Sequence, residues 1–282
     1  MRSFDYVTVG HVTVDVLSAD SSRRPGGGAF YSALQAARLG LRTLIVTQGS
    51  PTEIEALLEP YHKELELRII PAPATTTLDT SGLGAARTQR VLAWAGVIAE
   101  TVTVDTSILH FAPVAREGIP TWRGHADFVG FTPQGLARRW DEDGSGEIAQ
   151  SPLPTDRSSL DGLLPVGCSA IAISEQERAA CAPLLSAATD AGAVLAITAG
   201  AGATSLYLPD GAVTRVQAPA VAHPRDDLGA GDVFAAAFFT SLHEGHSPEQ
   251  AASNGNAAAA IRIGGVGADA VADRSAIEAL VR

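Results

Sequence analysis

The sequence predicts an α/β fold in which a mostly parallel sheet carries helices on its faces. Two observations support this prediction: β-branched runs end at polar edges, and near the N-terminus they alternate with a small-residue helix. The chain has 282 residues, of which 46% are hydrophobic and 18% charged, so it can bury a sizeable core. This length suits one large α/β domain or two small ones.

The N-terminal elements follow the order strand, helix, strand. Residues 6–17 form a β-branched run that predicts one strand with a polar end. Residues 29–39 are rich in small residues and predict a helix closed by Gly40, and residues 43–47 predict the next buried strand. This order predicts that the two strands pair in parallel, with the helix packed on the sheet.

The middle of the chain is less regular. Residues 65–98 contain short extended segments broken by Pro and Gly, which predict an antiparallel patch or arm beside the main sheet. Residues 107–113 and 128–131 predict short buried strands, and residues 141–165 predict a long surface loop or hairpin. The edge of the patch could pair with a second copy or serve as a flap, so both a monomer and a homodimer remain open.

The second half is more regular. Residues 170–174 and 194–198 predict strands, and residues 175–191 predict a helix that Pro183 breaks into two pieces. A Ser-Pro-Glu-Gln segment at residue 247 has the features of a helix start, and the helix should end near residue 263.

Charge and cysteine content exclude several classes of protein. The formal net charge of −11 argues against a general partner of nucleic acids or of anionic membranes. Cys168 and Cys181 lack a Cys-x-x-Cys spacing and are expected to be buried thiols in a reducing cytoplasm. The N-terminus does not have the pattern of a signal peptide, and no window approaches 18 uninterrupted apolar residues, so no transmembrane helix is expected.

The most informative segment is Asp226–Asp232, a small-residue turn that ends in an acid and opens a very apolar helix. Successive backbone N–H groups in such a turn, with a helix N-terminus behind them, bind an anion such as a transferring phosphoryl group. Asp232 stands where a carboxylate can take a proton from a substrate hydroxyl. The alternative is that Asp232 only caps the helix and the glycines only permit a tight turn.

Other unusual residues follow predicted strands at the same edge of the sheet. In an open parallel sheet, ligands bind at the carboxyl ends of the strands. Besides Asp232, the residues expected there are Asp15, Gly26–Gly28, Ser174, Glu175, Glu177 and Thr198–Gly202. Their shared edge favours a functional site over a set of unrelated structural residues.

In two segments the chain resembles the ribokinase and phosphofructokinase-B type of carbohydrate and nucleoside kinases. Gly26–Gly40 resembles the first family signature, a Gly-Gly pair before a helix that ends Ala-x-Leu-Gly. Asp226–Asp232 resembles the second, Asp-x-Thr-Gly-Ala-Gly-Asp. The resemblance runs over nearly the whole chain and implies that residues 1–282 form a single domain, a ribokinase-like three-layer α/β/α sandwich. Only ten residues, Val16–Pro25, separate Asp15 from the first signature, so the β lid should be small or reduced, with residues 65–98 as its cover.

The resemblance implies an ATP- and Mg²⁺-dependent kinase for a small sugar or polyol. Asp232 would be the catalytic base, and the amides of Gly229, Ala230 and Gly231 would stabilise the transferring phosphoryl group. Glu177 would support Mg²⁺. The expected substrate-binding residues are Asp15, Gly27, Gly28, Tyr31 and Arg87, the last reaching a polar substrate unless it is a solvated surface charge. The expected nucleotide-binding residues are Ser174, Thr198, Gly200, Gly202, Asn256 and Gly265.

Two residues depart from the family pattern. Leu228 replaces the Thr of the second signature, and Tyr31 replaces an Asn in the first helix. In the family a monovalent cation binds beside the anion site through the segment around Asp226, and the change at Leu228 leaves activation by K⁺ open. The departures also keep two alternatives: a nucleoside kinase of the same family, with Tyr31 stacked on a base, and a non-catalytic ligand-binding protein on the same scaffold.

Overall fold

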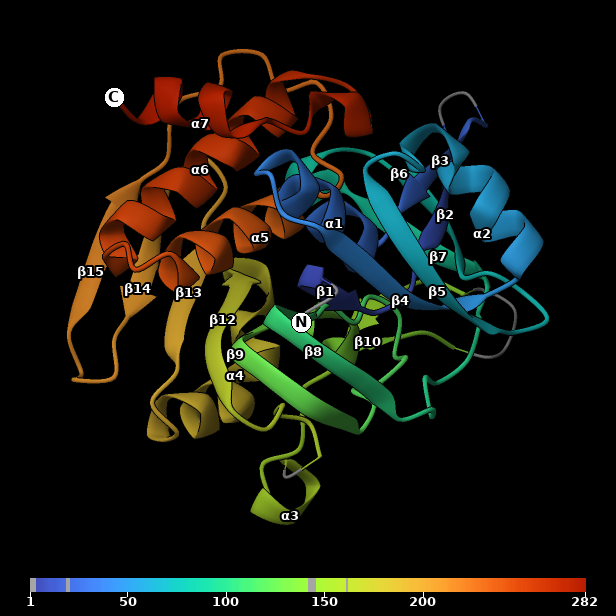
Figure 1. Cartoon of the computed structure of the whole chain (residues 1–282), viewed down its shortest axis with the longest axis horizontal. Coiled ribbons are helices and arrows are strands. Elements are labelled where there is room, and N and C mark those ends of the chain that lie inside the picture. The colour runs from blue at the N-terminus through green and yellow to red at the C-terminus, as the bar shows by residue number, and fades with distance from the viewer. Residues whose placement is uncertain (1–3, 19–20, 142–145, 161) are drawn as a thin grey trace.

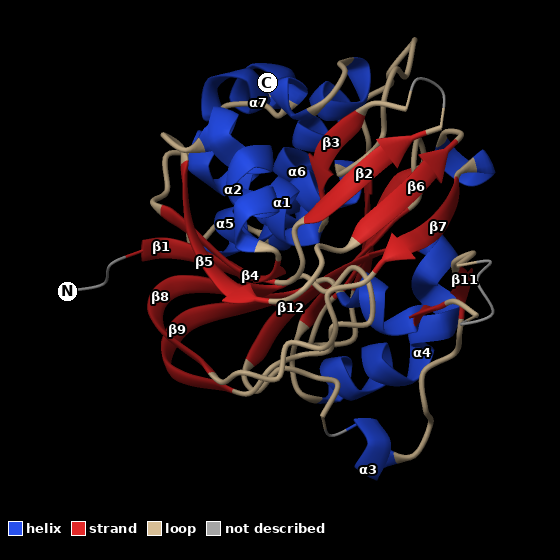
Figure 2. Ribbon diagram, turned by 90° about the vertical axis from the view of Figure 1, so that its right-hand side faces the viewer, coloured by secondary structure: helices blue, strands red, loops and turns tan. Residues whose placement is uncertain are grey.

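The computed structural model describes residues 4–18, 21–141, 146–160 and 162–282. Within them the chain forms a large nine-stranded sheet covered by helices and a separate four-stranded sheet beside it (Figures 1 and 2). The predicted α/β architecture with a mostly parallel central sheet and a small second sheet is confirmed.

The large sheet has the strand order β15-β14-β13-β12-β9-β8-β1-β4-β5. The seven strands from β13 to β5 pair in parallel, whereas β14 and β15 form an antiparallel hairpin at one edge, which the sequence analysis did not predict. The bounds are β1 Phe4–Val9, β4 Thr43–Gly49, β5 Leu65–Pro71, β8 Val102–Phe111, β9 Trp122–Phe131, β12 Cys168–Ser174, β13 Val194–Thr198, β14 Ala203–Tyr207 and β15 Val213–Gln217.

Helices cover both faces of this sheet. Residues of α1, α5, α6 and α7 pack together in one apolar core against β4 and β5, while α4 packs with β1, β8, β9, β12 and β13 in another. The α-helices are α1 Gly28–Arg38, α2 Pro51–Leu58, α3 Arg157–Leu160, α4 Glu175–Asp190, α5 Ala230–His243, α6 Pro248–Gly264 and α7 Arg274–Val281. The 3₁₀ turns are η1 Glu59–Tyr61, η2 Gly84–Ala86, η3 Pro133–Ala137 and η4 Ala268–Ala270.

The small sheet has the order β3-β2-β6-β7 and extends from the carboxyl end of β1 (Figure 2). Its strands are β2 Thr13–Leu17, β3 Arg23–Gly26, β6 Thr77–Ser81 and β7 Thr88–Ala93. A minor hairpin joins β10 Arg138–Arg139 to β11 Ala149–Gln150. Since β3 leads directly into α1, the small sheet is fixed to the start of the first helix.

Three predictions about individual elements are wrong. Residues 6–17 do not form one strand, because the chain leaves the large sheet at Gly10, where the carbonyl of Ala112 would lie 2.3 Å from an added Cβ. Residues 65–71 do not join the antiparallel patch, since β5 pairs in parallel with β4. Pro183 does not break α4, whose neighbouring side chains Cys181 and Leu184 are fully buried, so packing offsets the cost of the missing N–H.

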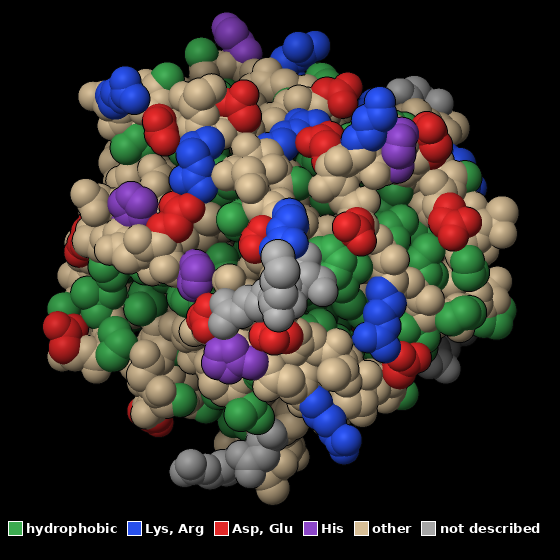
Figure 3. Space-filling model, viewed as in Figure 1, with side chains coloured by type: hydrophobic (Ala, Val, Ile, Leu, Met, Phe, Trp, Pro, Cys, Tyr) green, Lys and Arg blue, Asp and Glu red, His purple; other side chains and the backbone are tan. Residues whose placement is uncertain are grey.

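The described surface is mixed in charge. On the face drawn in Figure 3, acidic and basic side chains lie interspersed among apolar and neutral ones. Both cysteines are free and buried. Among the described residues, no helix combines the length and apolarity that crossing a bilayer would need.

Gly130 of β9 offers a test of how tightly α5 packs on the sheet. A Cβ at this position would lie 2.4 Å from the ring of Phe239, which is fully buried on α5. We expect Gly130→Ala to lower the free energy of unfolding by about 1–3 kcal/mol, the usual cost of overpacking. Chemical denaturation measures this loss. Gly162→Ala is the matched control, because no atom lies within 4 Å of its added Cβ; equal stabilities of the two variants would contradict the packing described here.

Candidate active site

A cavity of about 100 Å³ lies where the carboxyl edge of the large sheet, the small sheet and the N-terminus of α5 meet. Nine residues that the sequence analysis singled out line it: Asp15, Gly27, Gly28, Tyr31, Arg87, Gly229, Ala230, Gly231 and Asp232. The structure therefore brings the expected catalytic and substrate-binding residues together from segments that are distant in the sequence.

The anion turn, defined here as residues 226–231, forms the floor of this cavity. Gly229 is the N-cap of α5 and has φ 74°, and the ring of Tyr31 would lie 2.2 Å from a Cβ added there. Only glycine fits such a position without strain and collision. The N–H of Ala230 donates to the carbonyl of Asp227 at 3.2 Å, a long bond with which a bound anion can compete. The turn thus presents a helix N-terminus to the cavity.

Asp232 occupies the first turn of α5 and lies above the start of α1. Its Oδ1 would be 3.0 Å from a Cβ added to Gly28. Desolvation, followed by repulsion from Glu177, raises the pKa of Asp232 to about 6. A carboxylate with this pKa is ionised at neutral pH and can still accept a proton readily. No side-chain capping bond marks the N-terminus of α5, so the role of helix cap does not account for Asp232.

Asp15 faces the same cavity from β2 of the small sheet. Its side chain is buried, and its Oδ1 accepts a hydrogen bond from the hydroxyl of Thr13 at 2.8 Å. Burial raises the pKa of Asp15 to about 6, a shift that the Thr13 hydroxyl, Arg138 and Arg87 partly oppose. Its remaining lone pairs are available to substrate hydroxyls.

Glu177 lies at the N-terminus of α4, where it forms a capping box with Ser174. The backbone N–H of Ser174 donates to Oε2 at 2.9 Å, and the side-chain amide of Gln134 donates to Oε1 at 2.7 Å. Each carboxylate oxygen keeps a lone pair that could hold a metal-bound water. Among the described residues no group of three or more His, Cys, Asp or Glu side chains could bind a metal by itself.

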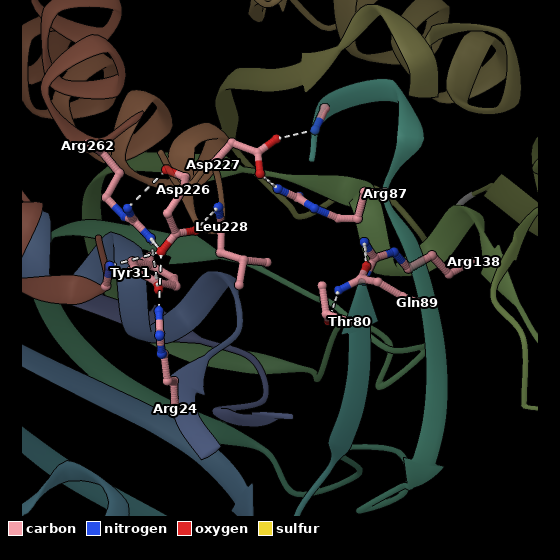
Figure 4. Close-up of polar contacts among 12 residues, drawn as sticks. Arg24, Tyr31, Thr80, Arg87, Gln89, Arg138, Asp226, Asp227, Leu228 and Arg262 are labelled. Carbon is pink, nitrogen blue, oxygen red and sulfur yellow. Dashed lines mark hydrogen bonds and ion pairs between the residues drawn. The ribbon is translucent and has the colours of Figure 1, made fainter. Parts of the chain in front are cut away.

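Arg87 and Asp227 connect the small sheet to the anion turn (Figure 4). The guanidinium of Arg87 forms an ion pair with Oδ1 of Asp227, and the N–H of Gly84 donates to Oδ2 at 2.7 Å. Arg87 is thus not a solvated surface charge, because it lines the cavity and its side chain is only 25% exposed.

Sequence reasoning missed two arginines near the cavity. Arg138 lines it and donates to the carbonyl of Val114 at 3.0 Å and to Oε1 of Gln89 at 2.9 Å; Gln89 in turn donates to Thr80 at 3.1 Å (Figure 4). Arg262 of α6 is fully buried beside the anion turn. Neither arginine stands in a recognisable motif, so only their position in the fold reveals them.

The residues expected to bind a nucleotide are not part of this cavity. Ser174 and Thr198 lie side by side at the ends of β12 and β13, and Gly200 and Gly202 follow in the next turn. The amide of Asn256 accepts from the Thr204 hydroxyl at 2.7 Å and donates to the carbonyl of Val216 at 3.2 Å. Both ends of the Asn256 amide are therefore used in joining α6 to the hairpin β14–β15. Gly265 is the C-cap of α6.

The fold is ribokinase-like, and an acid and the anion turn meet at the carboxyl edge of its central sheet. Residues 169–274 match the pfkB family of carbohydrate kinases. The matched region includes Asp232 and the anion turn.

Solved structures extend the likeness to nearly the whole chain. A pyrophosphate-dependent kinase in the ribokinase family, in a sulfate complex, is 17% identical with a TM-score of 0.75 over 97% of this chain and 99% of its own. A pyrophosphate-dependent kinase in the ribokinase family, complexed with a pyrophosphate analog and myo-inositol, is 18% identical, with a TM-score of 0.74 over 97% of this chain and 99% of its own. Ribokinase of Arabidopsis thaliana, complexed with ribose and ATP, is 15% identical, with a TM-score of 0.70 over 99% of both chains. No curated protein sequence matches the chain significantly.

The raised pKa of Asp232 has a consequence for stability. Because the folded state binds this proton more tightly than the unfolded state, ionisation of Asp232 destabilises the fold increasingly from about pH 4 to pH 6, and by the full amount above that. We expect Asp232→Asn to stabilise the protein by on the order of 2 kcal/mol at pH 7.5, and this gain to vanish as the pH falls from about 6 to 4. Thermal unfolding across that range measures it.

Asp273→Asn is the control for this measurement. Asp273 caps α7, and the N–H of Ala276 lowers its pKa, so its replacement should bring no gain at neutral pH. A loss of stability for Asp232→Asn at pH 7.5 would contradict the electrostatics of the site.

Proposed function

We propose that this chain is a kinase that transfers a phosphoryl group to a hydroxyl of a small sugar or polyol, with Asp232 as the catalytic base. The observation that carries the proposal is that Asp232, Asp15 and the N-terminus of α5 face one small cavity. Such a transfer needs three parts: a group that binds the substrate hydroxyls, a group that accepts a proton, and a site that binds the anionic phosphoryl group.

The acceptor would bind against Asp15. A carboxylate accepts two hydrogen bonds from neighbouring hydroxyls, and the backbone at Gly27 and Gly28 allows a close approach. The polar lining and the volume of about 100 Å³ suit a compact polyhydroxy compound. Arg87 and Arg138 add donors for its oxygens. A nucleoside fits less well, because Tyr31 packs beneath Gly229 and offers no open ring face there.

The chemical step would use Asp232 and the anion turn. Asp232 accepts the proton of the attacking hydroxyl, while the turn and the N-terminus of α5 stabilise charge on the transferred group. Mg²⁺, when bound, would neutralise charge on the donor phosphates. Glu177 would hold this ion through water, because its oxygens already accept bonds from Gln134 and Ser174. The donor phosphates must then complete the coordination of the ion.

ATP is the donor that the family resemblance implies, and a related ribokinase of Arabidopsis thaliana is described in complex with ATP. Pyrophosphate is a second candidate, favoured by a specific observation. Thr198, Gly200, Gly202, Asn256 and Gly265 do not line the cavity of Asp232, and the Asn256 amide is already engaged. A donor without a base and ribose needs only the anion turn and the ion, and one similar structure is a pyrophosphate-dependent kinase.

The test is turnover with ATP or pyrophosphate as donor and Mg²⁺ present, across a panel of sugars, cyclic polyols and nucleosides. Release of ADP or of inorganic phosphate is measured for each acceptor. We expect turnover with a sugar or polyol, and Asp232→Asn should lower kcat by about 10²–10⁴-fold because it removes the base. Binding of a donor without turnover on any acceptor would instead support a non-catalytic ligand-binding protein.

The pH dependence tests the role of Asp232 separately. Because the base must be ionised, kcat/KM should fall as the pH drops below about 6, the value to which burial and Glu177 raise the pKa of Asp232. Glu177→Gln removes a charge that raises the pKa of Asp232, so it should move this limb to lower pH. Glu175→Gln, an exposed change in the same helical turn, is the control. If kcat/KM falls at the same pH in Glu177→Gln as in Glu175→Gln, the charge of Glu177 does not raise the pKa of Asp232.

A further inference from the structure

Arg262 is an arginine with no exposed surface, and its guanidinium is directed at the anion turn from α6 (Figure 4). Its Nη1 donates to the carbonyl of Asp226 at 3.1 Å, and its Nη2 donates to Oδ2 of Asp226 at 3.0 Å. The guanidinium also lies 5.2 Å above the ring of Tyr31, and Nη2 is 3.3 Å from the hydroxyl of Tyr31. Three different segments of the chain therefore meet at one buried cation.

The carboxylate of Asp226 also accepts hydrogen bonds from the backbone. Its Oδ1 accepts the N–H of Leu228 at 3.0 Å, the residue directly before Gly229. Its Oδ2 accepts the N–H of Gly267 at 2.9 Å, which ties the loop after α6 to the same carboxylate. Arg24 of the small sheet adds a second cation at 3.7 Å from Oδ2. The position of Leu228, and with it the start of the turn, thus depends on where Arg262 holds Asp226.

Tyr31 supports the turn from below. Its buried ring lies where a side chain of Gly229 would otherwise be, and the same ring stacks on the guanidinium of Arg262. A cation over an aromatic face gains energy when both are shielded from water. Tyr31, a departure from the family pattern, is thereby joined with Arg262 in one unit.

Both members of the Arg262–Asp226 pair carry charge at neutral pH. Burial opposes ionisation of Asp226, but the N–H groups of Gly267 and Leu228 together with Arg262 keep its pKa below the ordinary value. Burial likewise opposes the charge of Arg262, and Tyr31 and Asp226 raise its pKa nevertheless. The turn therefore has a permanent cation of its own. Among the described residues, N–H groups and guanidinium groups already surround the carboxylate of Asp226. This carboxylate therefore does not fit K⁺ as a ligand.

We propose that Arg262 is a positioning residue that holds the anion turn in its binding geometry through Asp226 and Tyr31, and that its guanidinium takes the place of a monovalent cation. The inference rests on the proposed phosphoryl transfer for its kinetic readout only. Anion binding to the turn can be measured whether or not the chain turns over a substrate.

The experiment measures binding of inorganic pyrophosphate to the full chain by calorimetry, without acceptor, in Arg262→Ala and Arg262→Lys. We expect the affinity to fall about 10- to 100-fold in Arg262→Ala, the range for losing a charged hydrogen-bond partner, and less in Arg262→Lys. Guanidinium ion at a concentration that does not denature the protein should restore binding in Arg262→Ala alone. Arg274→Ala is the matched control, since Arg274 donates to the carbonyl of Leu39 and to the carboxylate of Glu244, away from the turn.

Kinetics provide the second readout once turnover is established. The KM for the phosphoryl donor should rise in Arg262→Ala while the KM for the acceptor changes little, and wild-type turnover should not change when K⁺ is replaced by tetramethylammonium. Wild-type affinity for pyrophosphate in Arg262→Lys and in a folded Arg262→Ala would overturn the positioning role. Strong activation of the wild type by K⁺ would overturn the proposal that the guanidinium of Arg262 takes the place of a monovalent cation. If the wild type binds pyrophosphate but has no turnover, the proposed function fails and the binding comparison still decides the role of Arg262.

Discussion

Parallel pairing of seven strands is the constraint on which the rest of this molecule depends. It brings the carboxyl ends of β1, β12 and β13 to a single edge, so that residues from distant parts of the sequence lie along the same side of the sheet. The small sheet grows out of the end of β1, and α5 begins beside it. Asp15, from the small sheet, and Asp232, from α5, can share a cavity only because this edge unites them.

The same edge concentrates charge that the fold must accommodate. Asp15 and Asp232 have raised pKa values because burial disfavours their ionised forms, and the charge of Asp15 further raises the pKa of Asp232. Arg138 and Arg87 oppose both shifts and offset part of the cost. Burying two carboxylates in this way costs stability at neutral pH and gives both side chains a pKa of about 6.

The sequence predicted the parts of the site that backbone geometry requires, and it missed those that depend on tertiary contacts. The anion turn was predictable because a helix N-terminus with left-handed Gly229 needs glycine, and the start of α6 because Ser247 and Gln250 form a capping box. Arg138 and Arg262 could not be predicted, because nothing in the sequence distinguishes an arginine that lies in a site from one on the surface. The break predicted at Pro183 was wrong for the opposite reason. The local rule that proline interrupts a helix predicted it, but packing of α4 in the core keeps the helix continuous.

The two sides of the cavity are built by different means, and Asp227 joins them. Beside the small sheet, side chains supply the polar groups, whereas at the N-terminus of α5 the backbone of the anion turn does so. Asp227 belongs to the turn, yet its carboxylate holds Arg87 and the N–H of Gly84 at the tip of the small sheet. Arg262 holds the neighbouring Asp226 from the opposite direction. Two adjacent aspartates thus anchor the anion turn between α6 and the small sheet, so the geometry of the turn and the position of the small sheet are fixed together.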